Sequence, residues 1–183
     1  MCPAQCRLLG GYVRRLCVAV FLLFVCFVSV SQSAVTTEWA VGTLTTVLST
    51  ELNSLASNAY TVASATYDNR IGQAGNGFTL CRIELVATFG GNPTANTGVS
   101  VWFLKSADGG TNFENTPTAT IGLGRPPDVV LPVTTGQTGT RVAVDVLCPA
   151  ERFRFVAKND GTGQTLAASG NIIRLLPITP QGN

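Results

Sequence analysis

The chain has 183 residues, of which 45% are hydrophobic and only 12% charged, with a formal net charge of +2. This composition excludes a disordered chain, and it lacks the strong positive charge of a non-specific nucleic-acid binder. There is no histidine, which excludes Ser-His-Asp and Cys-His catalysis, HExxH zinc hydrolysis and histidine-ligated metals.

The first 34 residues differ from the rest. They contain Arg7, Arg14 and Arg15 and no acidic residue, followed by an uncharged apolar run over 16–30 and a small, polar exit. These are the parts of a secretory signal peptide. The apolar run is short for a membrane-spanning helix, but flanking small residues could extend it, so a membrane anchor is the second interpretation. A third interpretation is an over-extended reading frame, with translation beginning near Val35.

Without residues 1–34, nine basic and ten acidic residues remain, a net charge of −1. We therefore expect no binding to nucleic acid, and no membrane association of the mature form. The sequence predicts an N-terminal arm with a short helix over 35–58 and one β-sandwich domain over 59–183.

The range 45–58 is the helix candidate. Leu44, Val47, Leu48, Leu52 and Leu55 recur at steps of three and four residues, which is helical periodicity. Trp39, just upstream, is expected to be an apolar anchor of this arm.

The rest of the chain alternates with period two, which is typical of half-buried strands. The range 99–105 is apolar on both faces, so we expect it to be covered on both sides or to lie at an interface. The predicted strands are 60–67, 78–89, 99–105, 129–133, 141–148, 152–158 and 171–177.

Glycine- and asparagine-rich turns separate these ranges, so we expect a mainly β, antiparallel sandwich or jelly roll of seven or eight strands. The range 112–129 contains Pro117, Pro126 and Pro127 and lacks periodicity, which predicts a long surface loop or arm. The tail, 177–183, looks irregular.

Two cysteines lie outside the leader, Cys81 and Cys148, both on the apolar face of a predicted strand. They are either buried free thiols or a disulfide between neighbouring strands, and the disulfide would require an oxidising compartment.

Candidates for chemistry are weak. The carboxylates of Glu84, Asp145 and Glu151 each have basic neighbours, which favours surface ion pairs over catalysis. Asp108 begins a turn rather than a calcium loop, and the GxG at 122–124 lacks the helix that phosphate binding needs. Arg152, Arg154, Lys158 and Arg174 are expected to form a solvated strand face. We predict no catalytic residue, metal ligand or cofactor site.

Several stretches resemble one family. They are Trp39 with its x-x-Gly continuation, TELNSLA at 50–56, Thr-Phe at 88–89, Pro-Thr at 93–94, DGGTNF at 108–113 and the turn at 158–171. Together they span 36–180 and resemble small virion structural proteins of tailed bacteriophages.

The resemblance implies a non-enzymatic β-sandwich, either a head decoration (cement) protein or a tail-associated protein, located in the virion. It implies other virion proteins as partners and a homo-oligomer. Because such proteins assemble in the host cytoplasm, it also favours an over-extended start over a secreted leader. Candidate interface residues are Trp39, Trp102, Phe103, Pro126 and Pro127. Trp102 lies on the opposite parity to Phe103, so it is either a core residue of the second face of its strand or an interface residue.

A competing interpretation accepts the leader. The domain would then be a secreted carbohydrate-binding or adhesin-like sandwich, with Trp39 or Trp102 stacking on sugar.

Overall fold

The computed structural model describes residues 38–71, 77–94, 96–118 and 122–181. In this part of the chain the secondary structure is nine strands and one 3-10 turn, η1 (Thr50–Leu52). The strands are β1 (Glu38–Val41), β2 (Thr45–Leu48), β3 (Tyr67–Asp68), β4 (Leu80–Thr88), β5 (Gly98–Ser106), β6 (Val129–Pro132), β7 (Gly139–Leu147), β8 (Arg152–Asp160) and β9 (Ile172–Gln181). The expected leader, 1–34, lies outside the described residues.

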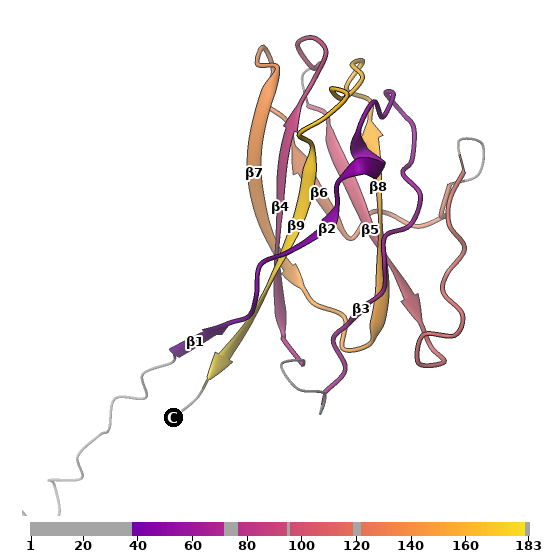
Figure 1. Cartoon of the computed structure of the whole chain (residues 1–183), viewed down its shortest axis with the longest axis vertical. Helices are drawn as coiled ribbons and strands as arrows, with labels where there is room; N and C mark the ends of the chain where they lie inside the picture. The colour runs from indigo at the N-terminus through magenta and orange to yellow at the C-terminus, as the bar shows by residue number, and fades with distance from the viewer. Residues whose placement is uncertain (1–37, 72–76, 95, 119–121, 182–183) are drawn as a thin grey trace, which may run out of the picture. The chain divides into compact units, whose positions relative to one another are not determined.

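The strands form two antiparallel sheets (Figure 1). One has the order β1-β9-β4-β7, with β2 also paired to β9, and the other has the order β3-β8-β5-β6. One buried core takes side chains from both sheets. The mainly β, antiparallel sandwich predicted from the sequence is confirmed, with more strands than expected and a single 3-10 turn in place of a helix.

The alternation of apolar and polar residues predicted the main strands correctly. On β4, Cys81, Ile83, Leu85 and Ala87 are buried while the residues between them are exposed or half-buried. On β8, Phe153, Phe155 and Ala157 are buried as predicted. β5 is buried on both faces along eight of its nine residues, because a loop covers the face that turns away from the core.

The helix predicted over 45–58 is wrong. Residues 45–48 form β2, which pairs with the first half of β9, and the backbone turns at Ser54 (φ 57°) and Asn58 (φ 65°). Leu48, Leu52 and Leu55 are buried as a helical face would require, but sheet pairing and the β-branched Thr-Thr-Val run outweigh periodicity.

The N-terminal arm and the C-terminal tail pair with each other, and this pairing was not predicted from their sequences. β9 runs to Gln181, and β1 pairs with it from Ile178 onward. Gly42 follows β1 where a Cβ atom would lie 2.6 Å from Pro177 and 2.9 Å from Phe78. The glycine therefore lets the arm cross β9 at close range.

Three phenylalanines form the aromatic centre of the core. The rings of Phe103, Phe153 and Phe155 lie 5.2–5.3 Å apart, in tilted and edge-to-face arrangements. Phe103 is 1% exposed, so this candidate interface residue is a core residue.

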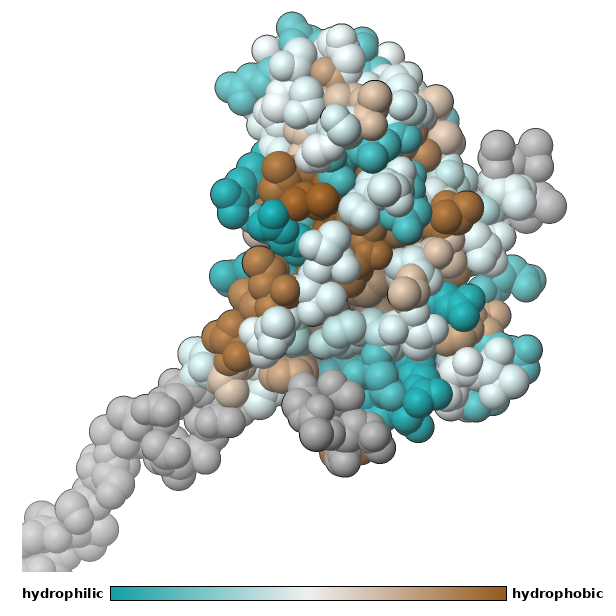
Figure 2. All heavy atoms as spheres, viewed as in Figure 1, coloured by the Kyte–Doolittle hydropathy of each residue, from teal (hydrophilic) through white to brown (hydrophobic). Residues whose placement is uncertain are grey.

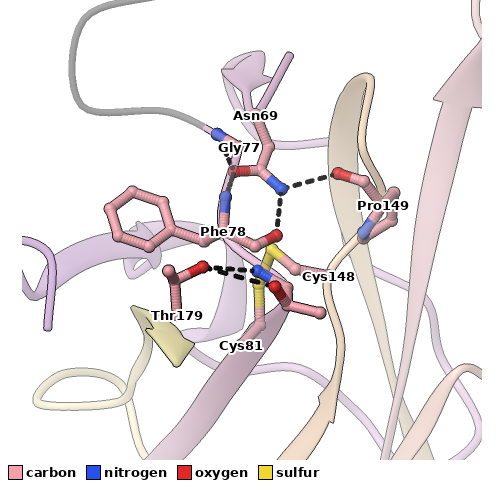
Figure 3. Close-up of a disulfide and its surroundings, with 8 residues drawn as sticks. Asn69, Gly77, Phe78, Cys81, Cys148, Pro149 and Thr179 are labelled. Atoms are coloured by element: carbon pink, nitrogen blue, oxygen red, sulfur yellow. Dashed lines mark hydrogen bonds between the residues drawn. A yellow bond between two sulfur atoms is a disulfide. The ribbon is translucent and has the colours of Figure 1, made fainter. Parts of the chain in front are cut away.

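A disulfide and a buried asparagine close one end of the sandwich (Figure 3). Cys81 and Cys148 form a disulfide between β4 and the end of β7. Beside it, the Asn69 amide donates to the carbonyls of Phe78 and Pro149, both at 2.9 Å, and its Oδ1 accepts from the amides of Gly77 and Phe78. One fully buried side chain thus joins three segments of the chain.

Replacing Asn69 tests this junction. We expect Asn69→Ala to lower the free energy of unfolding by about 3 kcal/mol, because four backbone groups lose their partner. Asn92→Ala, at an exposed position, is the matched control and should be near neutral. Urea denaturation measures both, and equal stability of the two variants would contradict this role.

Candidate interaction surfaces

The edge of β5 has two kinds of partner. β6 pairs with β5 only from Gly98 to Val101. Beyond Val101, side chains of the proline-containing loop take the place of a strand. The amide of Phe103 donates to Asp128 Oδ2 at 2.8 Å, and the amide of Lys105 donates to Glu114 Oε2 at 3.0 Å.

Arg125 completes this edge. Its guanidinium donates to the Phe103 carbonyl at 2.9 Å and forms ion pairs with Glu114 (2.9 Å) and Asp128 (2.8 Å). The three charged residues, which we call the edge cap (Glu114, Arg125 and Asp128), therefore satisfy backbone groups that a neighbouring strand would otherwise bond. The charges of these three residues therefore serve to hold the edge of β5.

The same loop covers Trp102. Its indole Nε1 donates to the Arg125 carbonyl at 3.2 Å, its ring lies 5.6 Å from that of Tyr60, and it is 5% exposed. Trp102 is thus a buried residue of the second face of β5. Of the other candidates, Pro126 is exposed and Pro127 half-buried beside the edge cap, whereas Trp39 lies in β1 of the other sheet.

The edge cap can be tested by removing its cation. We expect Arg125→Ala to lower the free energy of unfolding by about 2–3 kcal/mol, because it leaves two adjacent carboxylates without a counter-ion and one carbonyl without its donor. Arg82→Ala breaks one solvent-exposed ion pair with Asp145 and should stay close to wild type. Thermal and urea unfolding of the two variants provide the comparison, and an unaffected Arg125→Ala protein would contradict the cap.

β1 carries an exposed apolar surface. Beyond Ile178 the described partner of β9 is β1 alone, since β4 pairs with β9 only as far as Ile178. We call this two-stranded segment the ribbon (38–41 and 178–181); it extends away from the sandwich in Figure 1. Trp39 is 54% and Val41 58% exposed, and Figure 2 shows hydrophobic residues on the surface where β1 meets the body.

The carboxylates of the first sheet are engaged in ion pairs. Glu84 accepts from Arg141 at 2.7 Å and from Arg174 at 3.3 Å. Asp145 accepts two hydrogen bonds from Arg82, which lower the pKa of the carboxyl group. Cross-strand ion pairs are thus confirmed for Glu84 and Asp145.

The basic residues of β8 and β9 do not share a face. Arg174 lies in the other sheet from Arg152, Arg154 and Lys158. Arg152 pairs with Asp68 rather than Glu151, Lys158 pairs with Asp160, and Arg154 lies over the Phe113 ring at 4.2 Å. Each of these cations has a partner within the chain.

Asp108 organises the turn after β5. Its carboxylate accepts from the Ser106 hydroxyl at 2.8 Å and from the amides of Thr111 and Asn112. Hydrogen bonds from Asn112 and Ser106 lower the pKa of Asp108 to about 2. The oxygens face N–H and O–H donors, which is the arrangement of a turn and not of a cation site.

This pKa sets a pH dependence. The carboxylate stabilises the fold fully above its unfolded pKa of about 3.9, and the contribution disappears as pH falls through about 2. We expect Asp108→Asn to lower the melting temperature between pH 5 and 7. The difference from wild type should shrink towards pH 2. Calorimetry over this range measures it, and a difference that does not change with pH would contradict the assignment.

A surface depression of about 690 Å³ lies beside β6, lined by Asn96, Thr97, Gly98, Ser100, Pro127, Val130, Pro132, Val133, Thr135, Asp160 and Gly161. Among these described lining residues none is aromatic, so no ring is placed there to stack on a sugar.

Comparisons with known proteins do not assign the chain to a family. No protein-family model, curated protein or solved structure matches the chain. In the described ranges, His, Cys, Asp and Glu do not gather in groups of three that would hold a metal ion. Helices long and apolar enough to cross a membrane are also not found among these residues.

Proposed function

We propose that the chain is a non-enzymatic structural protein of a tailed-phage virion, a capsid decoration protein that packs on neighbouring virion subunits. The observation that carries the proposal is the ribbon. An isolated two-stranded ribbon is marginally stable in water, and this one exposes Trp39 and Val41. Docking on a neighbouring subunit would cover both residues.

The character of the surface supports this role. Residues 35–183 carry a net charge of −1, and the charged groups at Glu84, Asp145 and the edge cap are already paired within the chain. Such a surface can be buried against a protein without desolvating unpaired charges. The motif resemblance to phage structural proteins points to the virion as the place of that contact.

One observation favours the second candidate, a secreted carbohydrate-binding or adhesin-like module. The Cys81–Cys148 disulfide is typical of oxidising compartments. The sugar-stacking role proposed for Trp102 has less support, because the loop covers that ring. Trp39 then remains the candidate for stacking.

Sedimentation with mass spectrometry of the native protein separates the two candidates. We expect the protein to pellet with phage particles, with its first peptide beginning near Val35. A protein that stays outside the particles would contradict the virion function and support the secreted module; cleavage after about Ala34 would leave the same first residue, so the location of the protein decides.

The ribbon can be tested in the same assay. Trp39→Ser should reduce the amount retained on particles roughly tenfold, since it removes the large exposed aromatic. Val62→Ser, at a residue 68% exposed outside the ribbon, is the matched control and should be retained like wild type. Equal retention of both variants would exclude the ribbon as the docking element.

A further inference from the structure

We propose that two copies of this chain pair through their β7 strands, antiparallel and centred on Ala143, to make one continuous sheet. Such pairing of the chain with itself depends neither on the ribbon nor on the place where the protein works.

β7 is an open edge. In the described part of the chain it pairs with β4 and with no other strand, and it is the last strand of its sheet. Figure 1 draws it along the outer side of that sheet. It is nine residues long, GTRVAVDVL, with neither proline nor lysine, which are common protections of a sheet edge. The edge of β5, by contrast, is closed by the edge cap.

The backbone of β7 presents the right groups to a partner. Just beyond the two ends of the β4–β7 ladder, Phe89 N donates to Thr138 O and Cys148 N donates to Thr79 O. In an antiparallel pair, hydrogen-bonded positions alternate along the strand. Even-numbered residues of β7 therefore bond to β4, and Arg141, Ala143 and Asp145 direct their amides and carbonyls outwards.

The side chains of β7 favour a second copy of this chain as the partner strand, and they favour one register of the pairing. In an antiparallel pair centred on Ala143, Arg141 lies opposite the partner's Asp145, and this contact occurs twice because of the two-fold symmetry. Both residues are on the exposed face. Arg82 already pairs with Asp145 and Glu84 with Arg141, so charges of alternating sign would continue across the interface.

The remaining positions fit the same register. On the inner face, half-buried Val142 lies opposite the partner's Val144. Each of these valines, which are partly exposed in the single chain, gains an apolar neighbour. On the outer face, Leu147, 73% exposed, lies opposite the partner's Gly139, where no atom lies within 4 Å of a Cβ position. This register also pairs all nine residues of β7.

Analytical ultracentrifugation of the full chain with variants tests the pairing. We expect a wild-type dimer and, for Ala143→Pro, a roughly tenfold or greater weakening, because proline removes an outward amide that β4 does not use. Ala143→Thr keeps the amide and is the matched control. Circular dichroism shows that each variant is folded.

Charge exchange tests the register itself. Asp145→Arg places arginine opposite arginine, and Arg141→Asp places aspartate opposite aspartate, so each variant alone should be monomeric. A mixture of the two restores both opposite-charge contacts and should form a heterodimer. Wild-type monomer at all accessible concentrations, a dimer unaffected by Ala143→Pro, or no heterodimer on mixing would each overturn the proposal.

A different occupant of the edge would give a distinct result. If wild type is monomeric yet Ala143→Pro no longer sediments with phage particles, a strand of another virion protein occupies β7 and pairing between copies is wrong. If dimers form but never sediment with particles, the virion function fails while the β7 pairing stands.

Discussion

The structure depends on one requirement, which is that the backbone N–H and C=O groups along each strand find hydrogen-bond partners. Each strand carries rows of N–H and C=O groups on both of its sides, and these groups need partners. β9 obtains them from β4 on one side and from β2 and β1 on the other. β5 obtains them from β6 and then from the edge cap. Among the described strands, β7 pairs only with β4 and keeps a nine-residue row open on its other side, which suits it to assembly.

This constraint explains how the charged residues are used. A loop of 22 residues between β5 and β6 is long for a sandwich connection, and three of its side chains replace a strand along Phe103–Lys105. Arg125 must balance two carboxylates there, since two adjacent anions beside the sheet would repel each other. Glu84 and Asp145, which a search for catalysis would consider, are likewise paired with arginines.

The sequence predicted what depends on local alternation. β4, β5, β7 and β8 lie within a few residues of their predicted ranges, because each has at least one apolar face. It did not predict what depends on contacts between distant residues. Leu48, Leu52 and Leu55 have helical spacing, and only pairing with β9 makes their segment extended. The tail looked irregular because its partner is the distant N-terminal arm.

The same limit applies to the candidate surfaces. Trp39 was chosen as an apolar residue and lies on an exposed strand, whereas Trp102 and Phe103 were chosen for the same reason and are buried. Whether such a residue is exposed depends on whether a distant loop covers its strand. The range 112–129 has no periodicity, so its sequence does not predict that it covers β5. The edge cap had no sequence signal beyond three charged residues in a proline-containing loop.

Amide hydrogen exchange followed residue by residue at low and high protein concentration tests the use of the edges most directly. The amides of Val142 and Val144, which bond to β4, should be protected at both concentrations, as should those of Phe103 and Lys105 beneath the edge cap. The amides of Arg141, Ala143 and Asp145 should exchange fast when the protein is dilute and become protected when it is concentrated. Exchange of these three amides that is independent of concentration would contradict pairing at β7.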